Sequence, residues 1–278
     1  MTTPQPTDVA VRTWTPSPAS SPQTTPILLL HGIGGRADAF SAMGELLAEA
    51  GWTAVAWDAP GYGASPDPPD DVLGTDSPGA YVEAVVRLLD RLGAETAHLV
   101  GVSWGGVIAT HVAARVSGRV ASLTLIDSTR GSGTAEEKAA GMRARVDELI
   151  EFGGPAFAAR RAPRLLADGV EPAIAAEVAD HMGRVRLPGY RGAAEMMAQS
   201  DTGQLLPTLR VPTLVVVGDE DRVTGVDESR LLAREIPGAR YAEITGAGHA
   251  ASQERPVEVT AELLTFLSGL PVVERTGR

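Results

Sequence analysis

Short apolar runs separated by helical patterns constrain the fold of this chain more than any other feature of its sequence. The runs lie at residues 27–30, 53–57, 97–102, 120–126, 213–217 and 240–244. Continuous apolar runs of this length are typical of strands that are buried on both faces of a parallel sheet. Helical patterns lie between several of them, at residues 39–50, 79–92 and 105–116. The alternation predicts an α/β fold with a doubly wound, mostly parallel sheet, preceded by a short strand at residues 9–14.

One long interval, residues 132–206, interrupts this alternation. It is rich in Ala, Arg and Glu, it is broken by glycine and proline at 153–155 and 187–189, and it contains no convincing strand. We therefore expect a helical cap inserted between two strands, placed over the carboxyl edge where such sheets bind ligands. The predicted core then consists of residues 1–131 and 207–278.

Composition limits the partners that this chain can have. The formal net charge of the 278 residues is -11 at pH 7, which disfavours nucleic acid and anionic membrane surfaces. The chain has no cysteine, and residues 1–6 lack the basic and apolar segments of a signal peptide. We expect a cytoplasmic monomer or homodimer whose partner is a small-molecule substrate. We expect it to bind no metal ion, no membrane and no nucleic acid.

The most informative motif is Gly-Val-Ser-Trp-Gly at residues 101–105, between an apolar run and a helical pattern. A residue at such a tight strand-to-helix turn is held in a strained backbone conformation, and its neighbours two positions away must be small. Gly101 and Gly105 meet this requirement. The turn would raise the Ser103 hydroxyl above the sheet edge and aim the positive end of the helix dipole at it, so Ser103 is the candidate nucleophile.

A serine nucleophile requires a base, and the chain has five histidines. His31 ends a strand, His98 starts one, His111 lies in a helical pattern and His181 lies in the predicted cap. His249 differs, because it lies in a glycine-rich loop after the last strand, which could carry its side chain over the sheet edge. We take His249 as the base and expect His31 to hydrogen-bond loop backbone.

The acid that orients this base should follow a strand between Ser103 and His249. Asp221 is preferred because it lies farther into its loop, whereas Asp219 is placed to brace the turn. Asp127, at the end of the run 120–126, is a third candidate.

Two backbone N–H groups near the nucleophile would be needed to bind a developing oxyanion. The N–H of Trp104 directly follows Ser103, and the second donor should come from the glycine-rich loop after residues 27–30, where we choose Ile33. We expect Trp104, Tyr190, Met196 and Met197 to line the substrate pocket, although methionines at helical spacing are more often core residues.

The chain resembles the α/β-hydrolase superfamily in the order of its motifs. The matching segments are 31–32, 58–65, 101–106, 212–221 and 248–249, and the residues 200–207 look like the end of the cap of 3-oxoadipate enol-lactonases. The resemblance is closest to that enol-lactonase and small carboxylesterase branch. It implies an α/β-hydrolase fold, a lid formed by the helical insertion and no cofactor. Gly225 departs from the proline common after the acid loop, and a single strand before Pro26 departs from the usual two.

These features together predict a serine hydrolase that cleaves an ester or lactone of a small organic acid through an acyl-enzyme. Relatives that open epoxides or remove halide use aspartate at the nucleophile position, so Ser103 argues against both. A carbon-carbon bond hydrolase with the same triad is the alternative, and Arg143, Arg145 or Arg191 could hold its carboxylate. A cofactor-free haloperoxidase or a non-catalytic binding protein on the same scaffold also stays open.

Overall fold

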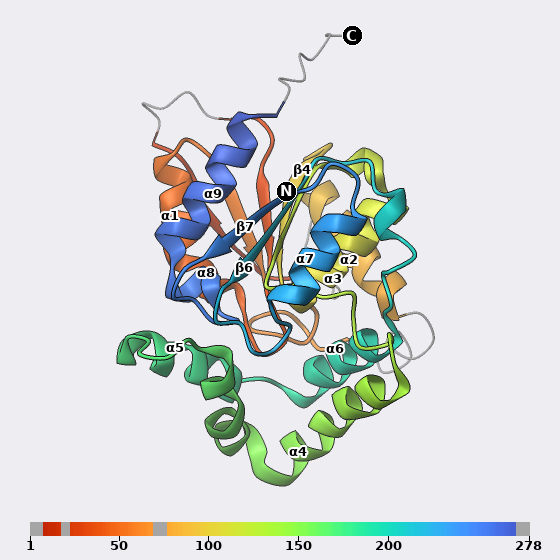
Figure 1. Ribbon diagram of the computed structural model, residues 1–278, viewed down its shortest axis with the longest axis vertical. Coiled ribbons are helices and arrows are strands. Elements are labelled where there is room, and N and C mark those ends of the chain that lie inside the picture. Colours follow the sequence, from red (N-terminus) through yellow and green to blue (C-terminus); the bar gives the residue numbers. More distant parts are fainter. Residues whose placement is uncertain (1–7, 18–22, 69–76, 271–278) are drawn as a thin grey trace.

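The computed structural model describes residues 8–17, 23–68 and 77–270 of the chain (Figure 1). The ends of the predicted core, residues 1–7 and 271–278, lie outside the described residues.

Seven strands form one sheet within the described part of the chain, in the order β1-β3-β2-β4-β5-β6-β7. The strands are β1 (Val11–Trp14), β2 (Ile27–Leu30), β3 (Ala54–Trp57), β4 (Ala97–Val102), β5 (Val120–Ile126), β6 (Thr213–Gly218) and β7 (Arg240–Ile244). β1 runs antiparallel to β3, and every other neighbouring pair is parallel. The predicted α/β fold with a mostly parallel sheet is confirmed, with the first strand beginning two residues later than expected.

Burial along the strands follows their place in the sheet. Every residue of β2, β3, β4 and β6 is buried, whereas three of the four residues of the edge strand β1 are exposed. Central strands of a doubly wound sheet are covered on both faces, which explains why their sequences are continuously apolar.

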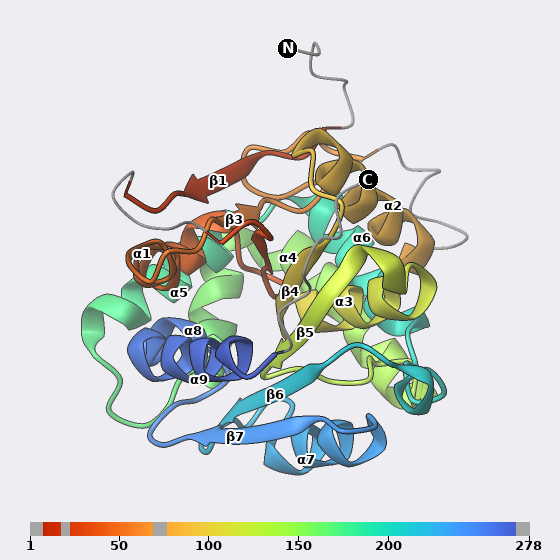
Figure 2. The same cartoon turned by 90° about the horizontal axis from the view of Figure 1, so that it is seen from above.

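Helices cover the two faces of the sheet (Figure 2). One face packs against α1 (Ser41–Glu49), α8 (Ala251–Glu254) and α9 (Pro256–Ser268), and the other against α2 (Ser77–Arg91), α3 (Trp104–Arg115) and α7 (Val226–Glu235). Two short 3-10 helices, η1 (Ala37–Phe40) and η2 (Ser117–Arg119), precede α1 and β5. The large apolar side chains on both faces, such as Phe40, Leu88 and Phe266, are almost completely buried.

The interval between β5 and β6 is helical and contains no strand in the described residues. It forms α4 (Glu136–Arg161), η3 (Ala162–Leu165), α5 (Pro172–Gly183), α6 (Leu187–Gln199) and η4 (Leu206–Thr208). The helices α4, α5 and α6 lie together at one end of the sheet, on the side where β6 ends (Figure 1). α4 is kinked at Gly153, whose φ of 70° is left-handed, two residues before Pro155.

None of the helices in the described residues is both long and apolar enough to cross a bilayer.

Candidate active site

Ser103 occupies the turn between β4 and α3 in a left-handed backbone conformation, with φ 51° and ψ -114°. A Cβ on Gly101 would lie 2.4 Å from the backbone of Gly105, and a Cβ on Gly105 would lie 2.0 Å from the carbonyl oxygen of Leu30. Side chains at these two positions would therefore collide with backbone, which explains why the motif needs glycine on both sides of the serine.

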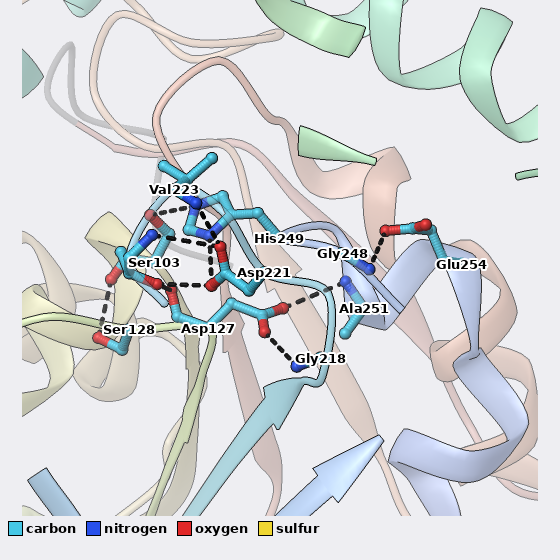
Figure 3. Close-up of polar contacts among 11 residues, drawn as sticks. Ser103, Asp127, Ser128, Gly218, Asp221, Val223, Gly248, His249, Ala251 and Glu254 are labelled. Atoms are coloured by element: carbon cyan, nitrogen blue, oxygen red, sulfur yellow. Dashed lines mark hydrogen bonds and ion pairs between the residues drawn. The ribbon is translucent and has the colours of Figure 1, made fainter. Parts of the chain in front are cut away.

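The loop after β7 brings His249 to this serine (Figure 3). His249 Nε2 lies 3.0 Å from Ser103 Oγ, although 146 residues separate the two in the chain. The loop is fixed on its other side by Glu254, whose carboxylate accepts hydrogen bonds from the N–H groups of Gly248 and Ala167 at 2.9 and 2.8 Å.

Asp221 completes a chain of hydrogen bonds, because its Oδ2 lies 3.0 Å from Nδ1 of His249. Asp221 also accepts bonds from the Thr224 hydroxyl at 2.6 Å and from the Val223 N–H at 2.7 Å. Burial on its own would raise the pKa of Asp221, but these donors and the charge of His249 outweigh it and lower the pKa to about 2. Asp221 is therefore ionised at neutral pH.

Sequence reasoning missed Thr224. The local signal at this loop is the Asp221 side chain, which can bond backbone two residues on and does so with the Val223 N–H. Through its hydroxyl, Thr224 holds Asp221 in place, and it also lies 3.2 Å from the carbonyl oxygen of Asp127.

The two other candidate acids bind backbone instead of His249. Asp219 accepts a hydrogen bond from the Gly246 N–H at 2.7 Å, which matches its expected bracing role. Asp127 is fully buried and accepts bonds from the N–H groups of Gly218 and Ala251, at 2.9 and 3.1 Å. Burial raises the pKa of Asp127 to about 8, with the nearby charge of Asp221 adding to the effect.

The electrostatic environment of His249 favours its protonated form. Burial lowers the pKa of this imidazole, but the hydrogen bond and charge of Asp221, together with the charge of Asp127, more than compensate and raise it above the usual 6.5. An imidazole whose positive charge is stabilised in this way is suited to accept a proton from a neighbouring hydroxyl.

The two residues that we selected as oxyanion donors are both near Ser103, because Trp104 follows it in the chain and Ile33 lines the same cavity. Trp104 is the first residue of α3, where a backbone N–H has no acceptor within the helix. Ile33 lies on the facing loop, whose Gly32 is close enough to Ser103 that an added Cβ would sit 3.3 Å from the serine Cβ. Neither N–H has a hydrogen-bond acceptor among the residues that the structure describes.

His31 has the structural role expected of it. Its Nδ1 lies 2.9 Å from the carbonyl oxygen of Gly32, and its Nε2 accepts a hydrogen bond from the Ala59 N–H at 3.1 Å. Burial lowers the pKa of His31 to about 4, so the ring is neutral and can accept on one nitrogen while donating on the other.

A cavity of about 620 Å³ opens at Ser103 and His249, between the sheet edge and the helices α4 to α6. Tyr190 and Met197 line it, as expected. The side chains of Trp104 and Met196 do not, which corrects our expectation for these two. Both are fully buried in the core next to the cavity, with the indole Nε1 of Trp104 3.0 Å from the sulfur of Met196.

The packing around Trp104 explains this correction. Its ring contacts those of His31, Tyr62 and Tyr81 at centroid distances of 5.0 to 5.8 Å. The Trp104 side chain therefore faces away from the cavity, and the role predicted for this residue at Ser103 concerns its backbone N–H alone.

Within the described residues, no three or more His, Asp or Glu side chains gather closely enough to hold a metal ion. The absence of a cofactor stays a prediction.

The fold and the cluster of Ser103, His249 and Asp221 indicate a hydrolase, and comparison with known proteins supports this class of enzyme. The sequence pattern of the alpha/beta hydrolase family matches residues 27–263, and the chain belongs to this family. Epoxide hydrolase A of Mycobacterium tuberculosis is 30% identical over 91% of this chain and 93% of its own length. The 3-oxoadipate enol-lactonase 1 of Acinetobacter baylyi is 25% identical over 73% of each chain.

Solved structures show the same relationship. A thermophilic esterase from Thermogutta terrifontis, determined with malate bound, superposes with a TM-score of 0.84 at 26% identity, over 94% of this chain and 93% of that one. The expected fold and a place near the enol-lactonases are thus confirmed. Because the relatives act on different bonds, they support a hydrolase without specifying the bond.

Proposed function

We propose that this protein is a serine hydrolase that cleaves an ester or lactone of a small organic acid. The observation that carries the proposal is the continuous chain of hydrogen bonds from Asp221 through His249 to Ser103, with both distances to the imidazole at 3.0 Å. Names among the relatives, which include an esterase with malate bound and an enol-lactonase, support this substrate class.

The first half of the proposed reaction forms an acyl-enzyme. His249 Nε2 takes the proton of Ser103 Oγ while that oxygen attacks the substrate carbonyl carbon. The N–H groups of Trp104 and Ile33 bind the oxyanion that develops, and Asp221 stabilises the imidazolium. Collapse of the tetrahedral intermediate expels the alcohol, which takes its proton from His249.

The second half releases the acid. A water molecule gives a proton to His249 and attacks the acyl carbon, and Ser103 leaves with that proton. In this scheme residues 132–206 act as the cap that encloses the substrate, with Tyr190 and Met197 on the cavity wall. The small-molecule substrate is thus the partner we propose for this chain.

The serine at position 103 also bears on the epoxide hydrolase among the relatives. Epoxide opening through an ester intermediate needs a carboxylate nucleophile, and a serine supplies none. We therefore assign carbonyl substrates to this chain in preference to epoxides.

Hydrolysis of p-nitrophenyl acetate and p-nitrophenyl butyrate tests the proposal. We expect wild-type turnover, and a loss of at least about a thousandfold in Ser103→Ala and in His249→Ala, because the triad acts as a unit. Ser268→Ala, which removes an exposed hydroxyl at the end of α9, is the matched control and should retain full activity. Equal rates in all four proteins contradict the proposal. Turnover of a vinylogous diketone without any ester turnover favours the carbon-carbon hydrolase instead.

A further inference from the structure

The walls of the cavity carry a charge opposite to that of the whole chain. Among the described residues that line it, one is a carboxylate, Glu228, and that group is already paired with Arg130 at 3.0 Å. Five lining residues are basic: Lys138, Arg145, Arg161, Arg164 and Arg222. The chain as a whole has a formal net charge of -11. A positive cavity in an acidic protein favours entry of an anion.

The partners of these cations single out Arg145. Arg161 binds Glu148 and Arg222 binds Asp168, each at 2.8 Å. Lys138 and Arg164 are exposed to solvent.

Arg145 is half-buried on α4, and no carboxylate of the described chain lies within ion-pair distance of it. Arg145 interacts with the buried Tyr190 hydroxyl, which carries no charge at neutral pH, since burial raises the pKa of that tyrosine. Burial also lowers the pKa of Arg145 itself, as expected for a charge that is poorly compensated by its surroundings.

Arg145 is also close to the proposed reacting groups. It lines the same cavity as Ser103 and His249, and its positive charge lowers the pKa of His249. One small molecule in this cavity of about 620 Å³ could therefore contact both Arg145 and the serine hydroxyl.

From these contacts we infer that the substrate carries a carboxylate in addition to the bond that is cleaved, and that the guanidinium of Arg145 binds it. A planar guanidinium offers paired donors that match the two oxygens of a carboxylate. The substrate class is thus the monoester or lactone of a dicarboxylic acid. This inference rests on the proposed hydrolase function and makes Arg145 a specificity-determining residue of it.

Two esters that differ in one group test this specificity. p-Nitrophenyl hydrogen adipate ends in a carboxylate, and p-nitrophenyl hexanoate ends in a methyl group on an acyl chain of the same length. We expect wild-type kcat/KM to favour the adipate ester, and the ratio of the two values to fall about tenfold to hundredfold in Arg145→Gln, mainly through KM.

Arg191→Gln is the matched control, because Arg191 is exposed on α6 and does not line the cavity. Its adipate-to-hexanoate ratio should stay within about twofold of wild type. Arg145→Lys, which keeps the charge but loses the paired donors, should give an intermediate ratio. A ratio that is the same in wild type and Arg145→Gln overturns the inference.

Binding of adipate itself, measured by calorimetry at low ionic strength, separates this inference from the proposed function. Adipate should bind wild type and Arg191→Gln alike and at least about tenfold more weakly to Arg145→Gln. If neither ester is hydrolysed by wild type but this difference is found, the proposed function fails and the anion site stands. No difference in adipate binding, or no binding to wild type, overturns the anion site even when both esters are hydrolysed.

Discussion

Ser103 adopts a backbone conformation that few L-residues adopt, and its glycine neighbours make that possible. Its φ of 51° costs on the order of 1 to 3 kcal/mol, which the surrounding packing must offset. The packing here is backbone against backbone, since β4 and the start of α3 approach the end of β2 at glycines. The strain places the hydroxyl within reach of His249 and leaves the Trp104 N–H free at the start of the helix.

Replacing one of these glycines should therefore be costly. In Gly105→Ala the new Cβ would lie 2.0 Å from the Leu30 carbonyl oxygen, so the turn must move. We expect urea unfolding to show a loss of about 1 to 3 kcal/mol or more, accompanied by loss of esterase activity. Gly118→Ala, where nothing lies within 4 Å of the added atom, should change stability by less than about 0.5 kcal/mol. Equal stability of the two variants would show that the close packing at Gly105 does not constrain the turn.

At the scale of elements, the site depends on the ends of three strands of the parallel part of the sheet, β4, β6 and β7, with β5 lying between β4 and β6. β4 ends at the serine, the loop after β6 carries Asp221, and the loop after β7 carries His249. Asp127, at the end of β5, connects the last two through its bonds to the N–H groups of Gly218 and Ala251. One buried side chain thus holds both loops at a fixed distance from the serine (Figure 3).

Asp127→Asn tests this connection. An asparagine offers one acceptor oxygen and an NH₂ group, so one of the two backbone N–H groups would face a donor. We expect a loss of about 1 to 3 kcal/mol in the free energy of unfolding and at least about a tenfold fall in kcat/KM. Asp219→Asn is the control, because the exposed Asp219 uses one oxygen for its bond to Gly246, and the amide retains that acceptor. If both variants behave as wild type, Asp127 does not position the loops.

At the scale of the whole molecule, the sequence predicted most of what depends on local pattern. Continuous apolar runs predicted the positions of the buried strands, and the glycine spacing around Ser103 predicted the turn. Asp221 was preferred to Asp219 for its depth in the loop, and the hydrogen bond to His249 agrees with that preference.

The remaining features of the site depend on tertiary packing, which no local sequence pattern predicts. Met196 and Met197 could not be separated into core and cavity by helical spacing, because α6 faces both. The side chain of Trp104, on α3, is directed into the core by its contacts with the rings of Tyr62 and Tyr81. The links made by Asp127 and the shared cavity of Arg145 and His249 bring together residues that are far apart in the sequence. Such contacts become visible only when the sheet and the helices between β5 and β6 are assembled.

The central claim is that His249 activates Ser103, and covalent labelling with a fluorophosphonate tests it most directly. The account predicts that intact wild-type protein gains one adduct, that peptide mass spectrometry places it on Ser103, and that His249→Ala labels far more slowly. Because the hydrogen bond and charge of Asp221 hold the pKa of His249 above 6.5, its neutral form is scarce in acid, so the labelling rate should rise with pH through that pKa. An adduct on another residue, or equal rates in wild type and His249→Ala, would contradict the account.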